Sequence, residues 1–407
     1  MFFRIAYRNI LRHQRRSLFT LVTIVSGVVG VILFGGFVEA NYTGLRESVI
    51  RSQYGHAQIY HEGYIENHRK TPNEVRMSPE QVDDMLGRLE GRDDVLVATR
   101  RLEFTGLLGN DSGSQAAIIR AVDPATESLI NSALTIIDGY DLDEEETEGA
   151  LLGEGLAEAL NAEIGDYLTL LSSDSDGAMN AVDVRVDGIF RSFAKEFDDR
   201  AMMMTMQQAQ ALLSTEDVDK IVVLLNETSM LPKFVQWLEQ DVLAQGEAFE
   251  FQEWFKMATF YHKVVDLYDG FFLFINIVII GIVLLAIANT MMITVMERTQ
   301  EIGTLRSLGA RKFTVSIQFI TEGMLLAGVS AVVGILVAAF LSYYITSLEI
   351  MMPAPPGSSQ GFPLRIEYVP VLWLKLFVGV VLLSSIATWY PSRTAVKKNI
   401  VEALRYV

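Results

Sequence analysis

Long runs of apolar residues dominate the hydrophobic pattern of this chain. Three runs contain no charged residue: Ser17–Val38, Gly270–Met296 and Gly323–Leu348. A fourth run, Leu376–Ser392, extends outward past Lys375. A helix needs about 20 apolar residues to cross the hydrocarbon core, and a lysine near a helix end can reach the interface. The pattern therefore predicts four membrane-spanning helices.

The first apolar run also has features of a secretory signal. Arg15 and Arg16 precede it, and Val38–Ala40 offers a small-residue cleavage site. The apolar core of a signal peptide is usually about 7–15 residues long, whereas this run is long enough for a full span. We expect a retained anchor, and cleavage is the alternative.

Between the first two runs the pattern changes to short alternating and amphipathic segments. Alternation predicts strands over 57–60, 95–108, 116–122, 165–171, 182–190, 220–225 and 249–254. Helical spacing predicts helices over 78–89, with Ser78 as N-cap, and over 154–160 and 231–243. We expect a mixed α+β domain over 39–270, in which residues from about 140 to 215 form a β-rich insertion.

Charge is divided unequally between these parts. The whole chain carries a formal charge of −17. Residues 39–270 hold 44 acidic and 18 basic residues, a balance of −26, and the remainder has a balance of +9. Basic segments mark the cytoplasmic ends of spans, and they occur at 1–16, 297–314 and 392–407. We therefore expect both termini to be cytoplasmic and the acidic domain to be periplasmic, in a bacterial inner membrane.

The predicted fold class is an α-helical membrane protein with four transmembrane helices and an extracytoplasmic α+β domain between helices 1 and 2. Arginines at helical spacing favour an amphipathic helix at the N-terminus, and a frayed basic terminus is the alternative. The expected segments are a cytoplasmic amphipathic helix (1–16), the first span (17–38), the outer domain (39–270), the second span (271–296), a cytoplasmic helix or loop (297–314), the third span (315–348), an outer loop (349–370), the fourth span (371–391) and a cytoplasmic tail (392–407).

Several kinds of chemistry are excluded or disfavoured by composition. The chain has no cysteine, which excludes disulfides, thiolate metal sites, a cysteine nucleophile and lipid attachment to cysteine. Strong acidity argues against nucleic acid as a partner. His56, His61 and His68 lack the carboxylate spacing of a metal site, and we expect them on the surface. We predict no catalytic, metal or cofactor site in this chain, and a membrane-anchored enzyme is a remote alternative.

Two segments carry a family signature. One is Met296–Arg311, followed by Gln318, Phe319 and Glu322-Gly323, and the other is Pro391–Ala395 with Val401–Tyr406. Both closely resemble the FtsX-like permease domain shared by the MacB, LolC and LolE transporters. Weaker similarity to the same family covers Ala6–Asn9, Leu152–Ala157, Gly165-Asp166 and Val186–Phe190.

The resemblance implies a type VII ABC transporter with a MacB-like periplasmic core domain. Four spans without a fused ATPase look most like LolC and LolE. No G-x-x-x-x-G-K-[ST] loop occurs, so ATP and Mg²⁺ would be bound by a partner chain. The implied partners are a cytoplasmic ABC ATPase dimer, a second permease copy, identical or different, a periplasmic adaptor or acceptor protein, and membrane lipids.

The segment after the second span is the main candidate site. It can form an amphipathic helix with an apolar face, charged groups at i, i+3 and i+4, and glycines that allow close approach or helix termination. The resemblance makes it the helix that couples to the ATPase, and a solvated turn that only enforces topology is the alternative. The candidate residues are Glu297, Arg298, Glu301, Ile302, Gly303, Leu305, Arg306 and Gly309.

A second candidate is Glu322, a membrane-embedded polar residue just inside the third predicted span. A carboxylate near the membrane boundary is costly unless it is paired or wetted, so it is a functional candidate. A position within the headgroup region is the alternative. Glycines in the spans can allow helices to approach closely, and those of interest are Gly27, Gly30, Gly35, Gly36, Gly328 and Gly334.

The predicted spans contain few polar residues, which argues against a hydrophilic conduit. The resemblance implies that ATP hydrolysis in the partner moves the outer domain, and that this motion extrudes lipoprotein or lipid-like cargo from the membrane. Two alternatives stay open. One is MacB-like export of peptides or toxins with a periplasmic adaptor, and the other is an FtsX-like regulator of a cell-wall hydrolase that transports nothing.

Overall fold

The computed structural model describes residues 14–68, 70, 72–144, 148–192, 194–353 and 361–397. The chain divides into two compact units: residues 1–43, 263–351 and 363–407 form the first, and residues 44–262 and 352–362 form the second. The amphipathic helix predicted over 1–16 lies outside the described residues except for 14–16, which begin the first long helix. The last part of the predicted tail, 398–407, also lies outside them.

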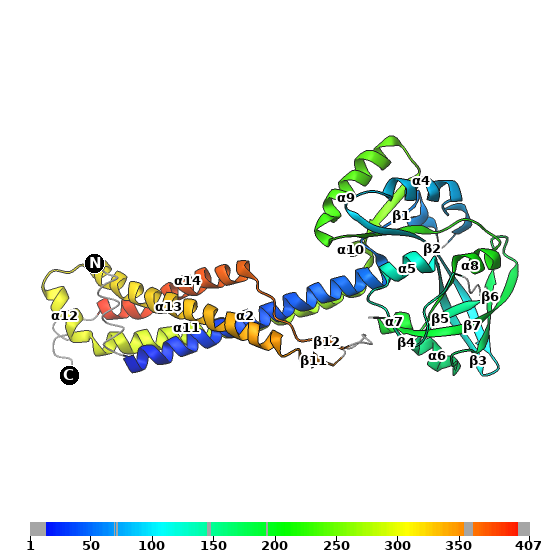
Figure 1. The fold of residues 1–407 in the computed structure, drawn as a ribbon. Coiled ribbons are helices and arrows are strands. Elements are labelled where there is room, and N and C mark those ends of the chain that lie inside the picture. The colour runs from blue at the N-terminus through cyan, green and yellow to red at the C-terminus, as the bar shows by residue number, and fades with distance from the viewer. Residues whose placement is uncertain are drawn as a thin grey trace. The chain divides into compact units, whose positions relative to one another are not determined.

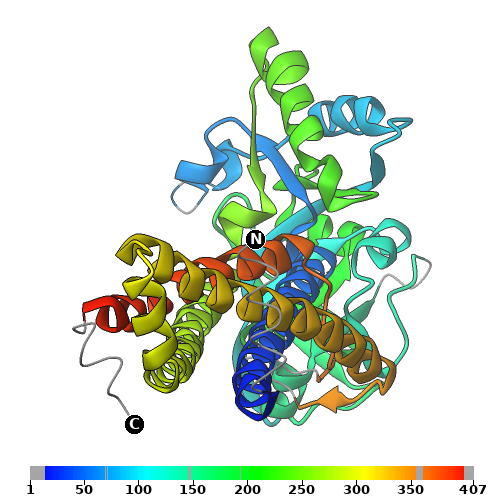
Figure 2. The ribbon, with the colours of Figure 1, turned by 90° about the vertical axis from the view of Figure 1, so that its left-hand side faces the viewer.

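The first unit is helical (Figures 1 and 2). Its described helices are α2 (Gln14–Val49), α11 (Thr259–Glu297), α12 (Thr299–Ser307), α13 (Lys312–Ser347) and α14 (Pro370–Lys397). Four of them, all but α12, are long and apolar enough to cross a membrane. The outer loop between α13 and α14 contains two short paired strands, β11 (Met351–Met352) and β12 (Phe362–Pro363).

Two of these helices are longer than the predicted spans. Helix α2 continues past Val38 to Val49 and passes into a π-helical turn, Ile50–Tyr54, while α11 begins at Thr259 rather than near 271. The compact outer unit is correspondingly shorter than the predicted 39–270. The apolar run predicts where a helix is in contact with lipid, but an amphipathic helix can continue beyond that run in water.

The helices of the first unit carry apolar side chains both in the core of the unit and on its surface. Ile24, Ile32 and Ile287 are at most 1% exposed and belong to a shared core. Leu273 and Leu285 are 63% and 72% exposed. Because a soluble helix would not expose such residues along its length, this pattern indicates contact with lipid.

Some of the glycines in the spans lie at close helix contacts. A Cβ at Gly27 would lie 2.9 Å from Val283 of α11, and one at Gly334 would lie 2.8 Å from Val28 of α2. The hypothesis of close helix approach is therefore confirmed at these two positions. At Gly36 the close neighbour is instead the carbonyl oxygen of Glu367, 2.5 Å away, in the connection that precedes α14. At Gly30 and Gly328 the nearest atoms are 3.7 and 3.9 Å away, so these two glycines are not required for packing.

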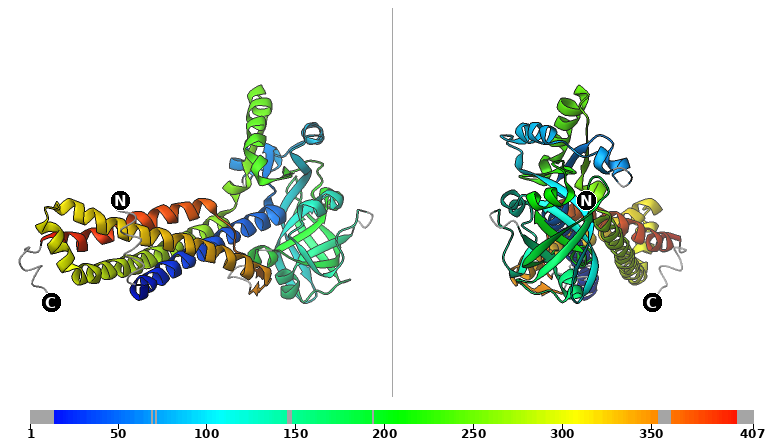
Figure 3. Two further views of the ribbon diagram at one scale, coloured as in Figure 1. Left: turned by 60° about the vertical axis from the view of Figure 1, so that its left-hand side comes forward. Right: turned by 90° about the vertical axis from the view of Figure 1, so that its right-hand side faces the viewer.

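The second unit contains ten strands among its described residues (Figure 3). They are β1 (Ala57–His61), β2 (Val95–Asn110), β3 (Gly113–Val122), β4 (Thr135–Gly139), β5 (Gly149–Gly153), β6 (Tyr167–Ser173), β7 (Met179–Arg191), β8 (Ala201–Thr205), β9 (Lys220–Leu225) and β10 (Phe249–Glu253). The helices are α3 (Tyr64–Asn67), α4 (Pro79–Leu89), α5 (Pro124–Ile130), α6 (Glu154–Leu160), α7 (Lys195–Asp198), α8 (Met206–Leu213), α9 (Leu231–Trp237) and α10 (Trp254–Met257).

The strands form a closed barrel and an open sheet that share strand β2. The barrel closes in the order β2-β3-β8-β5-β7-β6 and back to β2, and the open sheet has the order β10-β1-β9-β2. The first half of β2 pairs with β9 and the second half pairs with β3 and β6. The predicted β-rich insertion at about 140–215 therefore covers only part of the barrel, because β2 and β3 are also needed to close it.

The structure contains several of the caps and strands that the local sequence pattern predicts in this unit. Ser78 accepts a hydrogen bond from the Gln81 N–H, and the Gln81 side chain accepts one from Ser78 N–H, so the predicted N-cap is part of a full capping box. Strand β6 alternates exposed and buried residues along its whole length. Strands β9 and β10, predicted over 220–225 and 249–254, both pair antiparallel with β1, and α9 lies between them in the sequence.

Candidate functional site

The predicted coupling segment forms a separate short helix between two spans. Helix α11 ends at Glu297, and Arg298, with φ −100° and ψ 16°, interrupts the helical backbone before α12 starts at Thr299. After α12, Gly309 has a φ of +92°, a conformation that favours glycine, and α13 begins at Lys312. The chain therefore turns on itself through a tight helix–helix–helix connection.

Ile302 lies on the inner side of α12. We predicted an apolar helix face that contains Ile302 and Leu305, and Ile302 is 3% exposed and packs with Val295, Val315 and Phe319. Apolar residues at i and i+3 of a short helix need not have the same partner, since neighbouring helices cover one side of it first. Ile302 fixes α12 to the ends of α11 and α13. Gly303, also predicted as a site residue, is buried as well.

Arg298 joins the coupling segment to Glu322. Its guanidinium donates from Nη1 to Glu322 Oε2 at 3.1 Å and from Nε to Glu301 Oε2 at 2.8 Å. It also lies over the Phe319 ring, 5.4 Å from the ring centre. The side chains of Arg298 and Glu322 are 12% and 7% exposed, so this is a largely buried pair. Two residues that we predicted separately thus belong to one contact.

The remaining predicted residues lie on the outside of this connection. Leu305 is 41% exposed, and the neighbouring Leu308 is 81% exposed. The Glu301 side chain is 51% exposed. Glu297 and Gly309 are also exposed, while Arg306 is half-buried. The structure therefore separates an inner set that anchors α12 from an outer set that is available to a partner.

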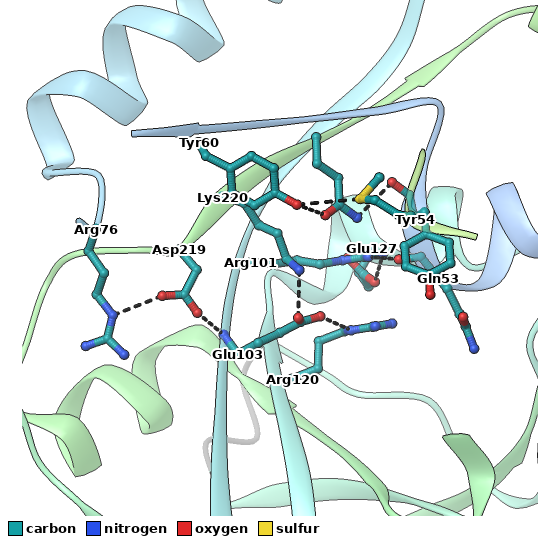
Figure 4. Close-up of polar contacts among 12 residues, drawn as sticks. Gln53, Tyr54, Tyr60, Arg76, Arg101, Glu103, Arg120, Glu127, Asp219 and Lys220 are labelled. Carbon is teal, nitrogen blue, oxygen red and sulfur yellow. Dashed lines mark hydrogen bonds and ion pairs between the residues drawn. The ribbon is translucent and has the colours of Figure 1, made fainter. Parts of the chain in front are cut away.

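The second unit contains a cluster of charged residues that we did not predict (Figure 4). Glu103 lies at its centre and accepts hydrogen bonds from Arg120 at 2.9 Å and from Lys220 at 2.6 Å. Its backbone N–H donates to Asp219 at 2.6 Å, and Asp219 accepts from Arg76 at 3.0 Å. The cluster lies where β2 passes from the open sheet into the barrel.

The environment of Glu103 determines its charge. Burial alone would raise the pKa of its carboxyl group, but Lys220 and Arg120 outweigh that effect and hold the pKa well below its usual value. Lys220 experiences the opposite balance, because burial lowers the pKa of its ammonium group while Glu103 raises it. Each of these charges is therefore compensated inside the cluster.

A buried ion pair between Arg101 and Glu127 lies beside this cluster. Arg101 is fully buried and donates to Glu127 at 2.6 and 3.1 Å, and Glu127 also accepts from Asn131 at 2.9 Å. Arg101 donates a further hydrogen bond to the carbonyl oxygen of Gln53, in the π-helical turn that follows α2. Arg101 and Glu103 stand at alternate positions of β2, so the sequence places both side chains on one face of this strand but does not show that the face is buried.

His56 contradicts the prediction of three surface histidines. It is fully buried, its Nδ1 accepts from the Leu225 N–H at 3.0 Å, and its Nε2 lies 3.0 Å from Thr228 Oγ1. Thr228 Oγ1 in turn donates to Glu47 at 2.9 Å. This arrangement requires the neutral ring with the proton on Nε2. Among the described residues, no three His, Asp or Glu side chains form a group suited to a metal.

We expect His56 to make stability dependent on pH. Burial lowers the pKa of its imidazole from 6.5 to about 4, so folding favours the neutral ring. Its contribution is complete above about pH 6.5 and is lost as the pH falls towards 4, by at most about 3 kcal/mol. Thermal unfolding of the full chain at pH 7.5 and 4.5 should show a smaller acid-induced loss in His56→Gln than in the wild type. His61→Gln should retain the wild-type loss, and equal losses in all three proteins would contradict this prediction.

The comparisons with known proteins agree with this architecture. A family model described as the MacB-like periplasmic core domain matches residues 17–241, and one described as the FtsX-like permease C-terminal domain matches residues 273–400. The chain is 26% identical to the lipoprotein-releasing system transmembrane protein LolC of Neisseria meningitidis, over 99% of this chain and 98% of the relative. It is 23% identical to LolE of Haemophilus influenzae, over 82% and 83% of the two chains.

A solved structure is a more distant match to this chain. The periplasmic region of MacB from Actinobacillus actinomycetemcomitans aligns with 51% of this chain and 93% of its own length, with a TM-score of 0.37 and 13% identity. The core-domain model alone covers more than half of the chain. The predicted fold class is confirmed, and the chain belongs to the FtsX-like permeases with a MacB-like periplasmic core domain, the permease type of the LolC, LolE and MacB ABC transporters.

Proposed function

We propose that this permease transmits the work of a separate cytoplasmic ABC ATPase to its outer domain and thereby releases lipoprotein or lipid-like cargo from a bacterial inner membrane. ATP and Mg²⁺ would be held by the ATPase dimer, and a second permease copy would complete the transporter. Both termini and α12 would face the cytoplasm. The segregation of charge, −26 in residues 39–270 and +9 elsewhere, supports this orientation.

The single observation that carries the proposal is the division of α12 into an anchored side and an exposed side. Ile302 and Arg298 attach the helix to α11 and α13, and Leu305 and Leu308 remain exposed at a turn between two spans. An exposed apolar pair on a firmly held helix is suited to a groove on a partner protein. A force applied there would reach both spans directly.

The cargo class is supported by the similarity to relatives named as lipoprotein-releasing system proteins. Helices α2 and α11 each contribute residues to both compact units, so motion of the spans has a continuous helical connection to the outer domain. Two alternative functions would be identified from the molecules that co-purify with the complex. A periplasmic adaptor would indicate peptide export, and a cell-wall hydrolase would indicate regulation without transport.

We expect Leu305→Glu with Leu308→Glu to uncouple the transporter. Placing two carboxylates in an apolar contact should weaken ATPase binding at least about tenfold, because each charge must be desolvated without a partner. The measurements are co-purification of the ATPase and release of radiolabelled lipoprotein from proteoliposomes. Leu96→Glu, a 50% exposed leucine of β2, is the matched control and should change neither. Wild-type release by the double variant would overturn the coupling role.

A further inference from the structure

The outer domain contains a cavity of about 460 Å³ that the proposed coupling does not use. It lies at the shared strand β2, where the open sheet meets the barrel. Strands β1, β3, β9 and β10, helices α3 and α10 and the π-helical turn after α2 also contribute to its lining. Cavities of this size accommodate small organic molecules. It borders the buried charge cluster, whose Glu103 and Lys220 form part of the lining.

One wall of the cavity is a rigid stack of aromatic rings. Tyr60 and Tyr64 are stacked with centroids 4.9 Å apart, and Tyr64 and His68 are stacked at 5.1 Å. The Tyr60 hydroxyl donates to Gln58 Oε1 at 2.5 Å, and the Gln58 amide donates to the carbonyl oxygen of Tyr54 at 3.0 Å. This wall is held in place by its own contacts and is preformed for a ligand.

Four polar side chains that line the cavity are uncharged and make no side-chain hydrogen bond to a described residue. Within the described part of the chain, the hydroxyls of Tyr54, Tyr64 and Thr105 and the amide of Gln252 line the cavity and make no side-chain hydrogen bond. Burial raises the pKa of both tyrosines, so their hydroxyls remain donors at neutral pH. The charged lining groups compensate each other, because Lys220 Nζ lies 2.6 Å from Glu103.

An apolar strip on the outside of the barrel begins at the cavity edge. Ile118 lines the cavity and is 40% exposed. It is the first member of a row of exposed apolar side chains that crosses neighbouring strands of the barrel. In this row Leu107 pairs with Ala116 of β3 and with Leu171 of β6, and Leu171 pairs with Ala181 of β7. A continuous exposed apolar row on a soluble surface indicates a binding surface.

We infer that the cavity and this strip together bind one uncharged amphipathic ligand, with a hydroxyl-bearing head group in the cavity and an alkyl chain along Ile118, Leu107 and Leu171. An anionic head group fits poorly, since the surrounding residues 39–270 carry a charge of −26 and the ammonium group of Lys220, which lines the cavity, is already held 2.6 Å from Glu103. A cationic head group would find no uncompensated carboxylate, because Glu103 already holds two cations. The inference rests on the proposed function for one point, that the ligand is cargo.

The test measures binding to the full chain in phosphatidylcholine nanodiscs, without ATPase or ATP. The probes are a short-chain alkyl glucoside carrying a diazirine on its chain and the matched alkyl phosphate. The glucoside should bind saturably and label peptides that contain Leu107, Ile118 or Leu171, and the phosphate should bind at least about tenfold more weakly.

The decisive variant is Tyr54→Phe with Tyr64→Phe, which removes two hydroxyls and keeps both rings. We expect it to weaken glucoside binding about tenfold. Tyr140→Phe alters an 81% exposed tyrosine outside the cavity and should have no effect. Unchanged affinity in the double variant, or tighter binding of the phosphate, would overturn the inference. Because the assay contains no ATPase, a failure of coupling leaves this result intact, and the reverse also holds.

Discussion

Replacing Arg101 with methionine should lower the free energy of unfolding by about 3–5 kcal/mol. The substitution leaves the carboxylate of Glu127, whose side chain is 3% exposed, without its cation. It also removes the donor to the carbonyl oxygen of Gln53. A buried charge without a partner is far more costly than a buried pair, because the desolvation penalty remains while the attraction is lost. Chemical unfolding of the full chain measures the effect.

Two further variants separate charge burial from loss of packing. Arg101→Met with Glu127→Met removes both charges and should recover most of the lost stability. Arg100→Met changes the adjacent arginine, which is 38% exposed and pairs with a 30% exposed Asp123, and should cost less than about 1 kcal/mol. If Arg101→Met and Arg100→Met lowered the free energy of unfolding by equally small amounts, the buried ion pair of Arg101 with Glu127 would not stabilise the fold as we predict.

The four spans could be predicted because a long apolar run is a local property of the sequence. Their ends could not, because Glu39 ends the apolar run while helix α2 continues to Val49. A charged residue marks the end of the segment that lies in the hydrocarbon core, but it does not end the helix. The same reasoning explains why α11 begins well before its charge-free stretch.

The barrel shows where local patterns stop being sufficient. Alternation correctly predicted the strands that became β2, β6 and β7, but not that β2 pairs with β9 in one half and with β3 and β6 in the other. Such pairings join residues that are far apart in the sequence, for example Leu107 with Leu171. Periodicity fixes which face a side chain occupies, but closure depends on partners that periodicity does not identify.

The charged residues show the same limit at the candidate sites. Arg298 and Glu322 were both named from the sequence, yet their contact follows from the turn that brings α13 back beside α11. Arg101 and Glu103 were overlooked because a strand with charged residues is usually taken as half-exposed. Charges at alternate positions place both side chains on one face of the strand, but the same pattern is typical of a solvent-exposed face, so the sequence alone did not distinguish a buried cluster.

We expect Arg298→Met to disrupt both stability and coupling. The Glu322 side chain is 7% exposed and would lose a 3.1 Å contact with its guanidinium partner, at a cost of about 3–5 kcal/mol. The α11–α12 junction would lose one of the residues that connect it to α13. Thermal unfolding in nanodiscs should show the first effect, and the lipoprotein release assay with the ATPase should show the second. Glu301→Gln, which changes a 51% exposed partner, should reduce stability by less than about 1 kcal/mol.

The double variant Arg298→Met with Glu322→Met distinguishes a structural pair from a coupling link. Removing both charges should restore most of the unfolding free energy, since no uncompensated charge remains. Lipoprotein release should stay low, because α12 is then no longer tied to α13 by a directional ion pair and a push on Leu305 and Leu308 would be absorbed at the junction. Recovery of both stability and release would show that the pair only stabilises the turn, and that force reaches the spans through Ile302 and its apolar neighbours.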